Sequence, residues 1–416
     1  MSEAFDPLSV AQDLSEIDVS DPMIFKHDAF RPIFARLRQE APVHYCKESP
    51  FGPYWSITRF HDIMAVDKNH HDFSSQGGVS IGNRSADFEA PNFISMDPPK
   101  HDLQRKAVTG VVAPMNLAKL EPVIRERAGW ILDDLPTGES FNWVDQVSIE
   151  LTTQMLATIF DFPFEERHKL TAWSDLATSS VATGGTLPDE DRREGLMQCL
   201  SEFTDLWNER VHWDPSEHND LITLMANDPA TAEMDPMEYL GNLILLIVGG
   251  NDTTRNSISG GVLGLNQYPL EYQKLSANPG LIPSMIPEII RWQTPLTHMR
   301  RIAKHDVSFQ GQRIKAGDKV VMWYVSGNRD ETAIDDPERF WIDRQNPRHH
   351  LSFGFGIHRC MGNRLAEMQL RVLWEEIMDR FEHVEVVGEP VRIASNFVRG
   401  IAELPVRVHR RKARAG

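Results

Sequence analysis

One cysteine lies in a pattern that suits a metal-ligating thiolate. Cys360 stands in residues 353–362 (FGFGIHRCMG), directly before a segment with helical periodicity. The start of a helix stabilises a thiolate through its dipole and its free backbone N–H groups. The glycines let the backbone approach a flat ligand closely, and His358 and Arg359 can meet an acidic group on that ligand. For Cys360 alone, a buried structural thiol in a glycine-rich turn is the alternative interpretation.

A second pattern follows a long apolar helical segment. Residues 243–248 (LILLIV) are apolar on every helical face, which indicates burial, and residues 249–254 (GGNDTT) come next. Each glycine costs about 1 kcal/mol in a helix interior, so glycines and polar groups in this stretch indicate a function. Asp252 and Thr253, an acid and a hydroxyl in this buried stretch, are therefore candidate functional residues. The structural alternatives are a carboxylate paired within the helix and a hydroxyl bonded to its own helix.

Basic side chains occur where several of them could bind one anion. His101 and Arg105 are four residues apart, so one helix face can present both. Arg301 is a further candidate, because an Arg side chain binds a carboxylate through paired hydrogen bonds. Glu288 and Arg291 are three residues apart, on one face of an expected helix. Taken singly, each of these residues is better explained as surface charge.

The elements that must position these residues are mostly helices. Segments with helical periodicity, bounded by Pro or Gly, are residues 117–135, 148–159, 165–178, 189–211, 237–267, 283–292 and 363–381. Residues 51–60 predict a short hairpin, and residues 307–325 predict a set of short strands. We therefore expect a mainly α fold with a minor β region. One domain should span residues 1–416, with an N-terminal lead-in (1–40) and a C-terminal tail (406–416).

The composition excludes several classes of protein. The chain has 416 residues, is 41% hydrophobic and carries a net charge of −17, so it can bury a core and repels nucleic acid. Its three cysteines include no CxxC pair, which argues against a disulfide framework or a zinc ribbon. No segment has the pattern of a signal peptide or the length of a membrane span. We expect a cytoplasmic monomer without nucleic-acid or membrane partners.

The cysteine segment resembles the haem-binding loop, FxxGxxxCxG, of the cytochrome P-450 family of haem-thiolate monooxygenases. Other family motifs agree in order along the chain. Residues 249–253 resemble (A/G)GxDT, residues 288–291 (EIIR) resemble ExxR, residues 337–340 (PERF) resemble PxRF, and residues 97–105 resemble DPPxHxxxR. The resemblance covers about residues 50–405. It implies the single-domain P-450 fold, in which haem b lies between a long central helix and the helix after the cysteine loop.

The resemblance also implies roles for single residues. Cys360 would be the axial ligand of the haem iron. Thr253 and Asp252 would relay protons to dioxygen, the co-substrate, for which Gly249 leaves room. Glu288 and Arg291 would meet Arg339 in a structural network behind the cysteine loop. The remaining cofactor contacts, which include the partners of the two haem propionates, would be His101, Arg105, Arg301, Phe353, His358 and Ala366.

The expected substrate contacts are all apolar, and none offers a charge to a polar substrate. By motif position they are Leu245, Val248, Leu296, Met299 and Phe397. Residues 249–261 and 350–374 resemble the bacterial subfamily that hydroxylates terminal carbons of medium-chain alkanes, alcohols and fatty acids. Residues 79–93 and 179–188 are the expected walls and lid of the channel.

Electrons must come from another protein, because the chain has no GxGxxG fingerprint and no iron–sulfur cysteine set. We expect a ferredoxin and a ferredoxin reductase to supply them from NAD(P)H. An acidic ferredoxin would suit a positive face around the cysteine loop, and a solvated basic face is the alternative. The residues that suggest this face are Arg344, Arg348, His349, His350, His358, Arg359 and Arg364.

Three other functions stay open at this point. The same scaffold could hydroxylate a terpene, a steroid or a polyketide. A peroxide-driven peroxygenase would need neither the Asp252–Thr253 pair nor a docking face. A haem-thiolate sensor without turnover would need no substrate channel. A binding difference spectrum with linear alkanes against bulky polycycles separates the first of these from terminal hydroxylation.

Overall fold

A computed structural model describes residues 13–83, 88–179 and 188–411 of the chain. The expected lid, residues 179–188, therefore lies almost wholly outside the described residues, as do residues 84–87 of the expected channel wall. Helices dominate, and the strands are short and few. The expected mainly α fold with a minor β region is confirmed.

The helices are α1 (Pro22–Lys26), α2 (Phe30–Glu40), α3 (Phe60–Lys68), α4 (Lys100–Thr109), α5 (Pro114–Asp133), α6 (Glu150–Phe160), α7 (His168–Thr178), α8 (Asp189–Arg210), α9 (Leu221–Asn227), α10 (Pro236–Gln267), α11 (Pro269–Ala277), α12 (Ile282–Gln293), α13 (Tyr324–Gly327) and α14 (Asn363–Arg380). All seven expected helices are present within a few residues of their expected bounds. The segments with helical periodicity did not include α1, α2, α3, α4, α9, α11 and α13, none of which is longer than 11 residues.

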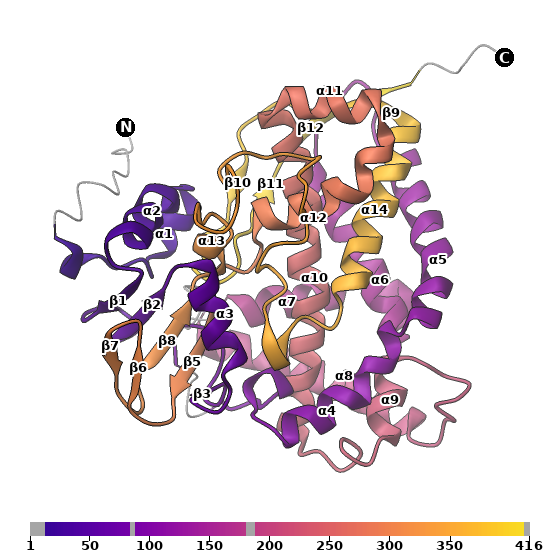
Figure 1. Ribbon diagram of the computed structural model, residues 1–416. Helices are drawn as coiled ribbons and strands as arrows, with labels where there is room; N and C mark the ends of the chain where they lie inside the picture. The colour runs from indigo at the N-terminus through magenta and orange to yellow at the C-terminus, as the bar shows by residue number, and fades with distance from the viewer. Residues whose placement is uncertain (1–12, 84–87, 180–187, 412–416) are drawn as a thin grey trace.

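Within the described residues the strands form four small sheets. Their bounds are β1 (Val43–Cys46), β2 (Tyr54–Ile57), β3 (Phe73–Ser74), β4 (Phe141–Asn142), β5 (Met299–Ala303), β6 (Val307–Phe309), β7 (Gln312–Ile314), β8 (Lys319–Met322), β9 (Phe381–Val386), β10 (Val391–Arg392), β11 (Ile401–Glu403) and β12 (Pro405–Arg410). The largest sheet has the order β1-β2-β8-β5-β3, and a second has the order β4-β12-β9. Figure 1 shows the larger sheet at one side of the molecule and the long helices at the other.

Two expected boundaries were wrong. Residues 51–60 do not form a hairpin by themselves, because only β2 lies there and its antiparallel partner is β1, with Val43 opposite Ile57. Residues 406–410 are no tail, because β12 pairs along its length with β9 and buries Val406 and Val408. The N-terminal lead-in also takes part in the core, since Phe30 and Phe34 of α2 are fully buried.

Helix α10 is the central element of the fold. The Asp235 side chain accepts a hydrogen bond from Met237 N–H, and Pro236 occupies the first turn, where a missing N–H leaves no bond unmade. The helix then runs unbroken for 32 residues, about 48 Å, and packs against α6, α7, α12 and α14. Figure 1 shows it passing through the middle of the helical part. The two main apolar clusters of the core meet along it.

The buried ion-pair network behind the cysteine loop corrects one expectation. Glu288 binds Arg291 through two hydrogen bonds of 2.7 and 2.8 Å, as the ExxR spacing suggested. The third member is Arg344, whose Nε lies 3.0 Å from the same carboxylate. Arg339 contributes only its carbonyl oxygen to Arg291, and its side chain pairs instead with Glu271 at 3.1 Å. Sequence order could not separate the two arginines, because each lies more than 50 residues from Glu288 along the chain.

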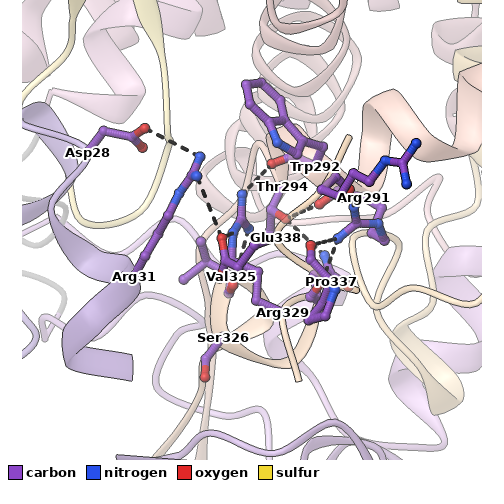
Figure 2. Close-up of polar contacts among 12 residues, drawn as sticks. Asp28, Arg31, Arg291, Trp292, Thr294, Val325, Ser326, Arg329, Pro337 and Glu338 are labelled. Carbon is purple, nitrogen blue, oxygen red and sulfur yellow. Dashed lines mark hydrogen bonds and ion pairs between the residues drawn. The ribbon is translucent and has the colours of Figure 1, made fainter. Parts of the chain in front are cut away.

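A neighbouring network ties the N-terminal helices to this region. Arg31 lies 3.6 Å from both Asp28 and Glu338, and Arg329 lies 3.6 Å from Glu338. Figure 2 shows Arg31 reaching between the two carboxylates, with Arg329 on the far side of Glu338. Arg329 also donates to the carbonyl of Trp292 at 2.8 Å, at the end of α12.

Among the described residues, none of the helices combines the length and apolarity that a membrane crossing requires.

Candidate active site

A cavity of about 340 Å³ lies between the middle of α10 and the segment that leads into α14. It brings together residues far apart in the sequence. Of the residues singled out in the sequence, those on its wall are Arg105, Leu245, Val248, Gly249, Thr253, Leu296, Met299, Arg301, Phe353, His358, Cys360, Ala366 and Phe397. Asp252 and His101 are not on this wall. Of the three cysteines only Cys360 lies there, since Cys46 and Cys199 are buried elsewhere.

The cysteine loop is held in a conformation that points donors at the sulfur. Cys360 N–H donates to the Phe353 carbonyl at 2.8 Å, which closes the loop. The backbone N–H groups of Gly362 and Asn363, at the start of α14, face the thiol and favour its ionised form, whereas burial raises its pKa above the ordinary value. A bound metal ion would deprotonate such a thiol. The site therefore suits a thiolate ligand of a metal.

Gly356 explains why this loop is glycine-rich. Its φ of +69° is one that residues with a side chain rarely adopt. A Cβ there would lie 2.5 Å from the carbonyl oxygen of Asp67 in α3. The loop can therefore pack on α3 only with glycine at this position.

Two buried histidines near the cysteine have nitrogen atoms without a partner among the described residues. They are Nε2 of His101 and Nδ1 of His358, and the two rings lie 4.3 Å apart. The other nitrogen of His358 lies 2.9 Å from Ser75 Oγ. Nδ1 of His101 lies 2.7 Å from the Asp102 carboxylate; burial lowers the pKa of this ring, and Asp102 opposes that shift. A free nitrogen that carries a proton can donate to an anion, and an anion beside His101 favours its protonated form.

The electrostatics of this corner also call for an anion. Burial, together with the neighbouring Arg301, His101 and Arg105, lowers the pKa of His358 to about 2. The charged groups of this corner, Arg105 and Arg301, are stabilised when negative charge lies between them, and His358 takes up a proton only beside such charge. A cofactor with acidic groups supplies that charge, so the residues present fit the two propionates of haem.

Arg301 is held by a carboxylate that the sequence analysis missed. Its Nη2 lies 2.6 Å from Asp67, and its Nη1 donates to the Arg300 carbonyl at 2.9 Å. Asp67 also accepts from the Tyr324 hydroxyl and from Phe355 N–H, both at 2.8 Å. Burial raises the pKa of Asp67, and these three donors oppose that rise. Only the spatial approach of α3 to the cysteine loop reveals this residue.

The polar stretch of α10 divides into a side that faces the cavity and a side that does not. Thr253 lies on the cavity wall and donates to the Gly249 carbonyl at 2.9 Å. A Cβ on Gly249 would meet nothing within 4 Å, so this glycine leaves open space. A Cβ on Gly250 would lie 2.7 Å from Leu156, so that glycine serves the packing of α6. The hydrogen-bond ladder of α10 continues through both positions.

Asp252 points away from the cavity and is fully buried. It accepts a hydrogen bond from Ser174 of α7 at 3.0 Å and forms an ion pair with Arg255. Arg255 in turn pairs at 2.6 Å with Asp175, whose side chain is 55% exposed. Burial raises the pKa of Asp252, and Arg255 opposes that rise. The carboxylate is thus linked to the surface through Arg255, while the hydroxyl of Thr253 faces the cavity.

The expected positive docking face is smaller than the sequence suggested. Arg344 is buried with Glu288, and His358 is buried against Ser75. Burial lowers the pKa of His350 to about 3, so this ring is neutral. Arg348 is exposed but paired with Glu367 at 2.7 Å. The exposed basic residues that remain near the loop are His349, Arg359 and Arg364.

Three features together define a haem-thiolate site. They are a thiolate at the start of a helix, an adjoining corner of basic donors, and an apolar cavity beside a helix that contains glycine. The comparisons agree with this class. A family model described as "Cytochrome P450" matches residues 189–406. The solved structure of "CYP153D17 from Sphingomonas sp. PAMC 26605" is 47% identical, with 94% of this chain and 99% of that chain covered and a TM-score of 0.89.

Two curated relatives are similar over nearly their whole lengths. Linalool 8-monooxygenase of Pseudomonas putida is 34% identical over 401 residues, which are 94% of this chain and 98% of that protein. Methyl-branched lipid omega-hydroxylase of Mycobacterium bovis is 31% identical over 392 residues, 90% of each chain. The chain belongs to the cytochrome P450 family. It is a monooxygenase that holds haem through a cysteine thiolate and uses O2.

Proposed function

We propose that the enzyme hydroxylates the terminal carbon of medium-chain alkanes, alcohols or fatty acids. The observation that carries this proposal is the apolar part of the cavity wall. Its side chains Leu245, Val248, Leu296, Met299 and Phe397 come from three separate segments and carry no charge. A wall that is mostly apolar orients a substrate mainly by its shape. A linear chain that enters methyl end first presents its terminus to the reacting centre.

The names of two relatives support attack at a chain end. One relative is named for C8 of linalool, which is a methyl carbon at the end of an acyclic chain. The other is named for the omega position of a methyl-branched lipid. Both names describe oxidation at a chain end. The first also makes an acyclic terpene alcohol the second candidate substrate class.

The haem, when bound, activates O2 so that one oxygen atom enters a C–H bond. The chain's own residues have four tasks in the proposal. Cys360 holds the iron through its thiolate, and His101, Arg105, Arg301 and His358 bind the propionates. The Thr253 hydroxyl holds a proton at the cavity wall. Asp252, through Arg255 and Asp175, connects that part of α10 with solvent.

A ferredoxin and its reductase would supply electrons at the face that carries Arg359 and Arg364.

The direct test is a substrate titration of the haem-loaded enzyme followed by product analysis. We expect linear alkanes and fatty acids to shift the Soret band of the haem and to give mainly terminal alcohols. A polycyclic steroid should give no shift. Saturable shifts with the steroid alone, or mainly subterminal alcohols from the linear substrates, would contradict the proposal. A strong shift and turnover with linalool but not with octane would favour the terpene alternative.

A further inference from the structure

Asp67 lies in the last turn of α3 and joins three elements of the active site. Its side chain is 1% exposed. One carboxylate oxygen accepts from Arg301 of β5 at 2.6 Å. The other accepts from the Tyr324 hydroxyl and from the backbone N–H of Phe355 in the cysteine loop, both at 2.8 Å. All three partners are donors, so the ionised carboxylate is the form that matches them.

The position of Asp67 is fixed more firmly than a surface ion pair would be. Gly356 of the cysteine loop lies directly against the Asp67 carbonyl, where no side chain would fit. The ammonium group of the next residue, Lys68, lies 5.3 Å from the ring of Phe355. The end of α3 therefore contacts the cysteine loop through backbone, carboxylate and ring at once.

Asp67 is also the negative charge that faces Arg301 inside the protein. Around Arg301 the corner also carries the basic side chains of His101, Arg105 and His358. In a buried environment the interaction between such charges is much stronger than in water. One buried carboxylate here must therefore affect any redox centre that the corner holds.

We propose that Asp67 is a positioning residue that holds the cysteine loop and keeps the reduction potential of the haem low. Reduction adds one electron from the redox partner to the iron and makes the centre more negative by one charge. A fixed anion nearby disfavours that change, and a neutral residue in its place favours it. The proposal rests on membership of the family and not on the substrate, so a failed substrate test leaves it standing.

The test is a potentiometric titration of the haem-loaded protein with Asp67→Asn. This variant keeps the size of the side chain and removes its charge. We expect the equilibrium constant for one-electron reduction to rise about tenfold, which is a shift of about 59 mV to more positive potential. The carbon-monoxide difference spectrum should stay that of a thiolate-bound haem. A purely structural role would lose haem without moving the potential of the haem that remains.

Asp62→Asn is the matched control. Asp62 lies on the same helix, is also buried, and binds the Gln310 side chain at 2.6 Å instead of the cysteine loop. The substitution removes the same charge from the same element, so it should leave the potential unchanged. Equal shifts in the two variants, or no shift in Asp67→Asn, would overturn the proposal.

A second variant keeps the proposal testable if Asp67→Asn does not bind haem. Tyr324→Phe leaves the carboxylate charged and removes one donor that offsets the charge. The potential should then move the opposite way, to more negative values, by less than the shift expected for Asp67→Asn. An unchanged or more positive potential in Tyr324→Phe would also overturn the proposal.

Discussion

At the scale of single residues, the division of α10 into two sides separates Thr253 from Asp252. Both were expected in one proton relay, yet only the Thr253 hydroxyl lies on the cavity wall. The carboxylate of Asp252 is committed to Ser174 and Arg255. In our proposal the Thr253 hydroxyl therefore holds the proton at the cavity wall, and Asp252 connects this part of α10 with solvent through Arg255.

Thr253→Ala should uncouple electron use from product formation. The hydroxyl that holds a proton at the cavity wall is lost, and we expect roughly a 10²-fold lower rate of product formation, with NAD(P)H still consumed. The measurement is the ratio of alcohol formed to NAD(P)H oxidised with a reconstituted redox system. Thr204→Ala is the control, because the Thr204 hydroxyl makes the same kind of bond to its own helix, at 2.7 Å, away from the cavity. If NAD(P)H oxidation stayed tightly coupled to alcohol formation in Thr253→Ala, the proposed role of the Thr253 hydroxyl would be wrong.

At the scale of elements, strand β5 and its flanks connect the cofactor corner with the substrate wall. Met299 and Arg301 face the cavity. The residue between them, Arg300, is buried and donates to the carbonyls of Gly78 and Gly82 in the loop of residues 77–83. Its N–H donates to the Val79 carbonyl at 2.7 Å, and Val79 itself is on the cavity wall.

Arg300→Gln should loosen that loop and with it the substrate end of the cavity. Several buried carbonyls lose their donor, at about 1–3 kcal/mol each. We expect weaker substrate binding in the Soret titration and a larger share of subterminal alcohols. Arg313→Gln is the control, since Arg313 of β7 is 78% exposed and pairs with the surface residue Asp306. If the two variants gave the same product distribution, the loop would have no part in regioselectivity.

His298 makes the same loop sensitive to acid. Its Nε2 accepts from Ile81 N–H at 3.0 Å, and Nδ1 lies 3.0 Å from the Asn396 carbonyl. Burial lowers the pKa of His298 from 6.5 to about 3. As the pH falls, His298 of the unfolded chain takes up a proton before His298 of the folded protein does. The neutral, buried ring therefore contributes fully to stability above pH 6.5, and this contribution is lost, at about 1.4 kcal/mol per pH unit, as the pH falls toward 3.

Denaturant unfolding at several pH values checks this expectation. The free energy of unfolding of the wild type should fall more steeply between pH 6 and pH 4 than that of His298→Gln, by about one proton. Gln keeps an amide that can bond Ile81 or Asn396 but does not titrate. Parallel curves for the two proteins would contradict a neutral, buried His298.

Prediction from sequence succeeded where the chemistry is local. The loop of Cys360, the segment around Arg301 and the stretch around Thr253 are each short and local, and all three residues line the cavity. It failed where a side chain takes its partner from a distant element. Asp67 meets Arg301 across 234 residues of sequence, and neither its neighbours nor its spacing distinguishes it from other acidic residues on helices. Arg344 was missed as the partner of Glu288 for the same reason.

At the scale of the whole molecule, the buried network of Glu288 with Arg291 and Arg344 joins α12 to the segment before the cysteine loop. Glu288 also accepts from Trp341 N–H at 2.8 Å, so one carboxylate holds three groups. Both arginines would remain buried without a counter-charge if it were neutralised. The network therefore fixes how the two halves of the site sit against each other.

Glu288→Gln should destabilise the fold by about 3–5 kcal/mol and reduce the haem content of the purified protein. Chemical denaturation and the ratio of Soret to protein absorbance measure the two effects. Glu367→Gln is the control, because Glu367 pairs with Arg348, whose side chain is 71% exposed, and such a pair contributes about 0–1 kcal/mol. Similar losses in both variants would show that the network has no special role.

The central claim is that Cys360 holds the haem iron as a thiolate. The carbon-monoxide difference spectrum of the dithionite-reduced protein tests it most directly. The wild type should give a Soret band strongly shifted to the red, and Cys360→Ser should lose that band even if some haem remains bound. A histidine-like band in the wild type, or an unchanged spectrum in Cys360→Ser, would contradict the assignment.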